Sequence, residues 1–99
     1  MSIYQTLQGT GLPCAYSYFR TPQEPPYIVY IGNGQDVFEA DNTHYWRRNT
    51  YQVEYYFTTK NEQNEASIED ALLEAGYLYE KSEDVYIEDQ NVFVIYYYI

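Results

Sequence analysis

The residue types that most often do chemistry are scarce in this chain. Cys14 is the only cysteine and His44 the only histidine. A catalytic triad would have to use His44, but no Gly-x-Ser-x-Gly elbow is present to supply the nucleophile. A lone cysteine is more often a small buried apolar residue than a nucleophile, so an enzyme that uses Cys14 remains only an alternative. One Cys and one His also fall short of a zinc site. We therefore predict no enzyme activity, no catalytic residue, no metal site and no cofactor.

Carboxylates are abundant, with 15 Asp and Glu against 5 Lys and Arg and a net charge of −10. Ten of the acidic residues lie between positions 62 and 89, opposed only by Lys60 and Lys81. Such a charge disfavours direct nucleic-acid binding, which requires clustered Lys and Arg. The acidic pairs at 83–84 and 88–89 lack the spacing and the glycine of a calcium loop. The acidic stretch is either a solvated face or a surface that meets a basic partner or repels DNA.

Two further short motifs have a simpler structural interpretation. Gly32-Asn33-Gly34 lacks the Lys-Ser/Thr ending of a phosphate loop and indicates a turn. Residues 45–48, Tyr-Trp-Arg-Arg, place two aromatic rings beside two arginines. Stacking on a nucleic-acid base is one possibility for them, and an anchor at a protein interface is the one favoured by the acidic remainder of the chain.

Tyrosine is the unusual feature of the composition, with 15 Tyr, 4 Phe and 1 Trp. A core of this size cannot hide so many rings, so several are expected at the edge of the core or on a contact surface, or facing solvent from strands. The candidate interface residues are Tyr45, Trp46, Arg47, Arg48, Tyr96 and Tyr98.

The patterning predicts a single α+β domain over residues 1–99, with the first half holding one helix and up to three strands. A short helix is expected over 3–11 and a strand within 13–19, followed by a proline-rich connector at 21–26. The apolar run at 27–31 predicts a strand covered on both faces and ended by the glycine turn. Residues 35–48 are expected to form a short edge strand around Val37-Phe38 or a loop.

The second half is more strongly patterned. Residues 50–58 alternate as a strand with one buried face, and 61–76 have helical periodicity. The residues expected to face the core are Ile68, Ala71, Leu72 and Ala75. Those expected to point away from it are Glu62, Glu65, Glu69 and Glu74. A capping box at Ser67 is an alternative helix start, and Gly76 is the expected stop.

Three strands are expected after the helix. They lie at 77–79, 85–87 and 92–99, the last two joined as a hairpin through 89–91. The final strand is apolar on both faces, so it must lie inside the sheet or against another subunit. The order is therefore about α-β-β-β-α-β-β: one mixed or antiparallel sheet of four to five strands with two helices packed on it.

Three groups of residues carry a resemblance to a known family: 12–16 with 25–30 (LPCAY and PPYIVY), 49–57 (NTYQVEYYF) and 79–87 (YEKSEDVYI). The chain resembles small tail-completion proteins, tail terminators or head–tail joining proteins, of siphophages and prophages of Gram-positive bacteria. That resemblance implies a structural virion protein that forms a ring, expected to be a hexamer, ends the tail tube and docks the head connector. Its partners would be copies of itself, the tail-tube protein and connector proteins.

Two expectations follow from this resemblance and the charge. An acidic face of Glu69, Asp70 and Glu74 could line a lumen through which DNA passes without sticking. The chain has no signal-peptide or membrane-span pattern, so it is expected in the host cytoplasm during assembly and then in the tail or neck of the virion. The alternative function is a small acidic DNA mimic that inhibits a host nucleic-acid enzyme.

Overall fold

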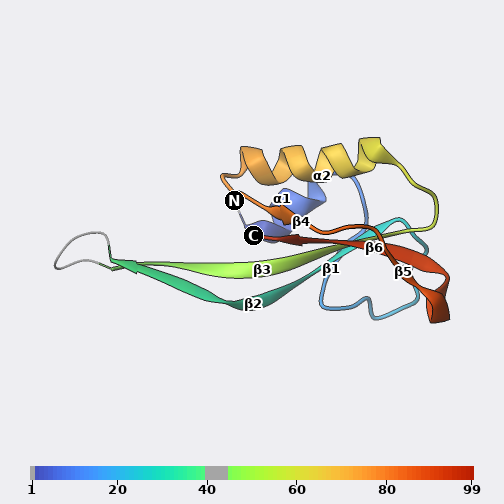
Figure 1. The fold of residues 1–99 in the computed structure, drawn as a ribbon, viewed down its shortest axis with the longest axis horizontal. Helices are drawn as coiled ribbons and strands as arrows, with labels where there is room; N and C mark the ends of the chain where they lie inside the picture. Colours follow the sequence, from blue (N-terminus) through green and yellow to red (C-terminus); the bar gives the residue numbers. More distant parts are fainter. Residues whose placement is uncertain (1, 40–44) are drawn as a thin grey trace.

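The fold is an α+β domain in which two helices cover one face of a mixed sheet, as the sequence predicted (Figure 1). The computed structural model describes residues 2–39 and 45–99. Within these ranges the sheet has six strands, one more than expected, in the order β1-β2-β3-β6-β4, with β5 also pairing with β6. None of the helices in the described ranges is long and apolar enough to cross a membrane.

The N-terminal segment contributes α1 (Ile3–Gln8) and β1 (Cys14–Tyr16). A capping box starts the helix: Ser2 Oγ accepts from the backbone N–H of Gln5 at 3.1 Å, and Ser2 N–H donates to Gln5 Oε1 at 3.0 Å. Ile3 and Leu7 are buried one turn apart. β1 pairs in parallel with the start of β2, which makes the sheet mixed.

The strands β2 (Tyr27–Glu39) and β3 (Tyr45–Phe57) are far longer than expected. Ile28, Val29 and Tyr30 are all buried, so the prediction of a strand covered on both faces is confirmed. The predicted turn at residues 32–34 is wrong. The strand continues there through a bulge with Gly34 at φ +134°, because pairing with β3 absorbs the extra residue. Of the two alternatives predicted for 35–48, the strand around Val37-Phe38 is correct, but it is the continuation of β2 and not a separate short strand, and it pairs with residues 45–49 of β3.

The core lies between the helices and the covered face of the sheet. Alternation in β3 is as predicted, with Val53, Tyr55 and Phe57 buried on the helix side. The helix α2 (Glu62–Glu74) places Ile68 and Leu72 against them.

Three residues of the predicted α2 faces are wrong, and one of them, Glu69, is half-buried and accepts a hydrogen bond from Tyr97. Ala75 is exposed, because it is already the C-terminal cap of the helix. Glu65 is buried, because it shares the inward face three residues before Ile68. The start is Asn61, whose side chain accepts from the backbone N–H groups of Gln63 and Asn64, and not Ser67.

The C-terminal half closes the sheet. Gly76 has φ +89° and ends α2 as predicted. The predicted strand at 77–79 is wrong, because these residues form no strand and β4 (Glu80–Lys81) begins just after them. β5 (Val85–Ile87) joins β6 (Val92–Tyr98) through the 3₁₀ turn η1 (Glu88–Gln90). The hairpin prediction is confirmed.

The last strand does not need a second subunit to cover it. β6 pairs with β3 along one edge and with β4 and β5 along the other. Val94, Ile95 and Tyr97 are fully buried within the single chain. Of the two placements predicted for this strand, the one inside the sheet is correct, so any argument for assembly must rest on other surfaces.

Candidate interaction surface

The paired ends of β2 and β3 project from the body of the domain as a two-stranded arm (Figure 1). We call residues 35–39 and 45–49 the hairpin arm. It accounts for the elongated shape of the molecule, whose principal extents are 51 × 25 × 24 Å. All of its residues are exposed, and within the described residues no third strand pairs with it. Side chains on the arm are therefore available to another molecule on both faces.

The arm is apolar where solvent-exposed strands are usually polar. Four large side chains on it are widely exposed: Val37 (62%), Phe38 (52%), Tyr45 (71%) and Trp46 (68%). A protruding cluster of this kind is typical of an interaction site, whereas single exposed apolar residues are ordinary.

Strand register divides the arm into two faces. Phe38 pairs with Trp46, and next to them Asp36 and Arg48 form an ion pair at 3.2 Å, all on one face. Val37 opposite Arg47, and Glu39 opposite Tyr45, lie on the other face. The basic residues predicted as anchors are therefore on opposite faces of the arm.

The body has a second surface, the sheet face opposite the helices, which we call the helix-free face. Its most prominent side chains are Tyr27, Glu54, Tyr56, Tyr96 and Tyr98, which alternate with the core-facing residues of β2, β3 and β6. The rings of Tyr27 and Tyr56 stack at 5.0 Å, and those of Tyr96 and Tyr98 at 6.3 Å.

Glu54 organises the centre of this face. Its Oε1 accepts a hydrogen bond from the hydroxyl of Tyr56 at 2.6 Å, and its Oε2 accepts one from Gln52 Nε2 at 2.9 Å. Burial, together with the hydrogen bond to Glu54 and its charge, raises the pKa of Tyr56. The phenol therefore stays protonated and remains a donor, which holds the ring in place on the sheet.

A hollow of about 500 Å³ opens on the helix-free face. Val29, Tyr27 and Tyr56 form the sheet side of the hollow. The segment between β1 and β2 supplies Tyr18 and Phe19 as a wall, with the Phe19 ring edge-on to Tyr27 at 5.3 Å. That segment lies below the sheet, on the side away from the helices (Figure 1). The hollow is thus lined by four aromatic side chains, and Arg20 is the only charged residue among those that line it.

The predicted interface residues fall in two places. Strand alternation puts Trp46, Arg48, Tyr96 and Tyr98 on the same side of the extended sheet, whereas Tyr45 and Arg47 lie on the reverse of the arm. Sequence reasoning missed the apolar pair Val37 and Phe38 as surface residues, and it missed the hollow. The pairing of Phe38 with Trp46 follows from strand register alone, and no local motif indicates it.

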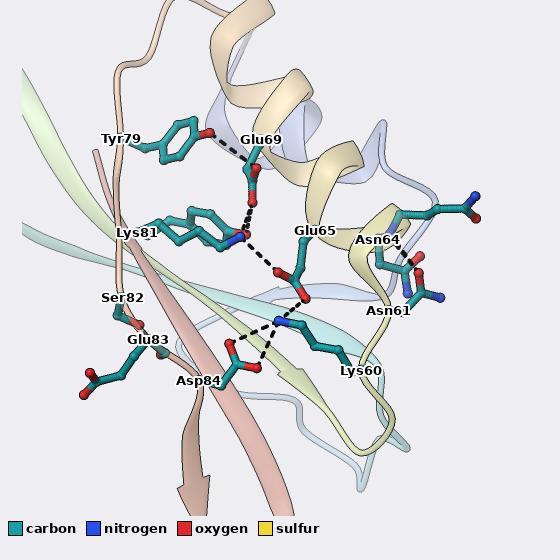
Figure 2. A network of polar contacts seen from close by, with 12 residues as sticks. Lys60, Asn61, Asn64, Glu65, Glu69, Tyr79, Lys81, Ser82, Glu83 and Asp84 are labelled. Atoms are coloured by element: carbon teal, nitrogen blue, oxygen red, sulfur yellow. Dashed lines mark hydrogen bonds and ion pairs between the residues drawn. The ribbon is translucent and has the colours of Figure 1, made fainter.

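A network of charges fastens α2 to the C-terminal segment (Figure 2). Glu65, only 3% exposed, lies between two lysines: its Oε1 is 2.9 Å from Lys81 Nζ and its Oε2 is 2.8 Å from Lys60 Nζ. The second contact is also a short ion pair, and the carboxylate of Glu65 raises the pKa of Lys60. Lys60 also contacts Asp84 at 3.0 Å. The network holds the helix, β4 and the segment before β5 together.

Glu69 belongs to the same network and not to an exposed acidic face. Its carboxylate accepts from the hydroxyls of Tyr97 at 2.7 Å and Tyr79 at 3.4 Å, and it lies 2.8 Å from Lys81 (Figure 2). Burial raises the pKa of Glu69, but hydrogen bonds from Lys81 and Tyr97 outweigh it and leave this pKa below its ordinary value. Of the three residues predicted for that face, only Asp70 and Glu74 are exposed.

The residues weighed for chemistry offer little reactivity. Burial raises the pKa of Cys14 to about 11, so its thiolate is scarce at neutral pH. His44 lies outside the described residues. Across residues 2–39 and 45–99, no three His, Cys, Asp or Glu side chains are grouped so that they could hold a metal ion.

Comparison with known proteins adds no family assignment. No model of a known protein family matches the chain, and no curated protein sequence matches it either. The interaction surfaces must therefore be interpreted from their own chemistry.

Proposed function

We propose that this protein is a non-enzymatic structural subunit that assembles with copies of itself into a ring at the head–tail junction of a phage. There it would end the tail tube and dock the head connector. The observation that carries the assembly part of this proposal is the hairpin arm, with four widely exposed apolar side chains. Its place at a head–tail junction rests on the resemblance in residues 12–16, 25–30, 49–57 and 79–87.

The exposed apolar side chains of the hairpin arm favour assembly, because leaving them in contact with water is unfavourable. Exposed strand edges and apolar side chains pair readily with other chains, and proteins usually cover them, shorten them or charge them. Here they project on a two-stranded hairpin that no other strand or helix of residues 2–39 and 45–99 covers. Sister subunits or a tail-tube protein would bury these residues.

The ion network bears on the alternative, a DNA mimic. A mimic needs carboxylates displayed along one face like backbone phosphates. Three of the ten acidic residues between positions 62 and 89 instead contact lysines of their own chain: Glu65, Glu69 and Asp84. We therefore prefer the assembly subunit.

Sedimentation analysis of the purified protein over rising concentration tests the proposal. The expected result is a concentration-dependent shift from monomer to a closed oligomer, with rings visible by electron microscopy. Adding the protein to polymerising tail-tube protein should shorten the tubes. A chain that stays monomeric with and without tube protein, and leaves tube length unchanged, contradicts the proposal.

A further inference from the structure

We propose that the two strands of the hairpin arm are complementary edges, so that β3 of one copy pairs with β2 of the next copy and extends the sheet between them. The inference rests on the proposed ring assembly and names the contact that would build it. Both edges of the arm are open: β1 pairs with β2 only at residues 28–30, and β6 pairs with β3 only at residues 52–57. Beyond these neighbours the arm continues as two strands alone (Figure 1).

The open edges offer backbone hydrogen-bonding groups to a further strand. In an antiparallel pair, about half of the N–H and C=O groups of each strand point away from the partner strand. On the arm these groups belong to residues 35–39 and 45–49, and no third strand of the described residues pairs with them. Five residues are close to the usual length of a β-strand, so each edge can form a ladder with a strand of another chain.

The charges on the two strands of the arm have opposite signs. The β2 strand of the arm carries Asp36 and Glu39 and no basic residue, whereas the β3 strand carries Arg47 and Arg48 and no acidic residue. Two β2 edges brought together would repel each other, and so would two β3 edges, because like charges on neighbouring strands destabilise a sheet. A β2 edge beside a β3 edge joins opposite charges. The arm therefore selects the opposite edge of a second copy as its partner.

Ion pairing within the arm leaves these charges able to contact a second copy. Asp36 and Arg48 contact each other at 3.2 Å, yet their side chains are 48% and 47% exposed. Each has more hydrogen-bonding positions than one contact uses, so each can bind a further partner on its open side. Glu39 and Arg47 share the other face of the arm, and neither forms an ion pair within residues 2–39 and 45–99.

The same pairing brings the exposed rings of neighbouring arms together. A ladder in the register that the arm already uses places Phe38 of the next copy beside Trp46. Aromatic pairs on neighbouring strands stabilise a sheet. Arg47 lies on the face opposite these rings, but a contact between strand edges uses both faces at once, because side chains alternate between them. The charges and the rings therefore serve one contact.

Pairing of opposite edges is a head-to-tail contact. Each copy offers one β2 edge and one β3 edge, so contacts can continue from copy to copy until a ring closes. Pairing of like edges, β2 with β2 or β3 with β3, would stop at a dimer. The two arrangements respond in opposite ways when the charges of the two strands are exchanged, and this difference makes the inference testable.

The charge-exchange variant combines Asp36→Lys and Glu39→Lys on β2 with Arg47→Glu and Arg48→Glu on β3. All four positions are exposed, so the core is untouched. The net charge stays at −10, because two acidic residues become lysines and two arginines become glutamates. Positions 36 and 48 keep opposite signs, so the arm should still form.

Arg20→Glu with Glu24→Lys is the matched control, because it exchanges two exposed charges outside the arm and also leaves the net charge unchanged. Circular dichroism checks that each protein is folded. Wild type and each variant are then labelled with different fluorophores, mixed, and compared by fluorescence energy transfer.

The charge-exchange variant is expected to self-associate as strongly as the wild type. Mixed with the wild type, it should sort into separate assemblies, because every contact between the two proteins would join edges of like charge. We expect the association constant of such mixed contacts to be lower by about 100-fold or more. The control should mix with the wild type at random.

Two half-variants give a second test. One carries only the β2 substitutions and has two basic edges, and the other carries only the β3 substitutions and has two acidic edges. Neither should self-associate, whereas their equimolar mixture should. Half-variants that self-associate alone, or a mixture that stays monomeric, overturn the pairing.

The outcomes separate the inference from the proposed function. Preferential mixing of the charge-exchange variant with the wild type would identify pairing of like edges, and random mixing would identify a contact away from the edges. Either result, or a folded variant that does not self-associate, overturns pairing of opposite edges and leaves assembly of copies standing. Sorting in the control as well would overturn the assignment of the contact to the arm. A wild type that stays monomeric, with or without tail-tube protein, overturns both ideas.

Discussion

In the body of this domain tyrosine and branched apolar side chains lie under two helices, whereas on the hairpin arm the same kinds of side chain lie in solvent. The contrast occurs within single strands, because β2 and β3 each run 13 residues through both regions. Tyr55 in the body is fully buried and Trp46, nine positions earlier on β3, is 68% exposed. Local composition is therefore not what decides burial here. Neighbouring strands and the helix layer decide it, and both end before the arm begins.

The largest effect should come from the helix layer of the body. Leu72→Ala removes a fully buried side chain from the core, and we expect a loss of about 2–5 kcal/mol in the free energy of unfolding. Leu73→Ala, one residue on and half exposed, should change it by less than about 0.5 kcal/mol. Urea denaturation of both variants measures the difference. Similar losses in the two would mean that α2 does not cover the sheet as described.

The second largest loss of stability is expected on substitution of Glu65, the buried carboxylate of the charge network. Glu65→Gln leaves Lys60 and Lys81 without their shared partner, and we expect a loss of about 1–3 kcal/mol, below that of fully buried pairs because both lysines reach solvent. Glu62→Gln is the control, since it also removes a charge from the first turn of α2 but is exposed. A loss at Glu65 no greater than at Glu62 would show that the network adds nothing beyond the helix-dipole effect.

A smaller, pH-dependent effect is expected at Glu69. Its folded pKa lies below the ordinary value of 4.5, so the stabilisation is complete above that pH and is lost as the pH falls through the folded pKa. Glu69→Gln should cost about 1–2 kcal/mol at pH 7, the worth of hydrogen bonds to a charged group. The cost should shrink at pH 3. Denaturation at both pH values checks the sign, and a cost that is constant with pH contradicts it.

The body was the part of the molecule that sequence patterns predicted well. Alternation over residues 50–58 and the helical period at Ile68 and Leu72 both record which side faces the core. The burial of Glu65 was also visible in that period, three residues before Ile68. The charge of Glu65 argued against burial, since a carboxylate is rarely buried unless it is paired. The two lysines that pair with it lie 5 and 16 positions away in the chain, so the sequence did not indicate the pairing.

The arm and the hollow were not predictable in the same way. Gly32-Asn33-Gly34 suits a turn or a bulge equally well, and only pairing with β3 decides between them. Tyr18 and Tyr27 meet in the hollow because a connector crosses the helix-free face, which no local period encodes. Both features depend on contacts between distant segments, so they appear only when the sheet is assembled.

The smallest effect on the isolated chain should come from the arm itself. Phe38→Thr with Trp46→Thr removes two rings that their own chain leaves exposed, so the free energy of unfolding at low protein concentration should change by less than about 0.5 kcal/mol. Tyr55→Thr on the same strand should cost about 3 kcal/mol or more, because it leaves a cavity at a fully buried position.

Denaturation repeated at high protein concentration then compares the stability of the wild type with that of the arm variant when copies can associate. Binding to the folded state stabilises it by mass action, so the wild type should gain stability with concentration and the arm variant should not. If the arm variant is strongly destabilised even when dilute, its rings are covered within their own chain, and the distinction between body and arm fails.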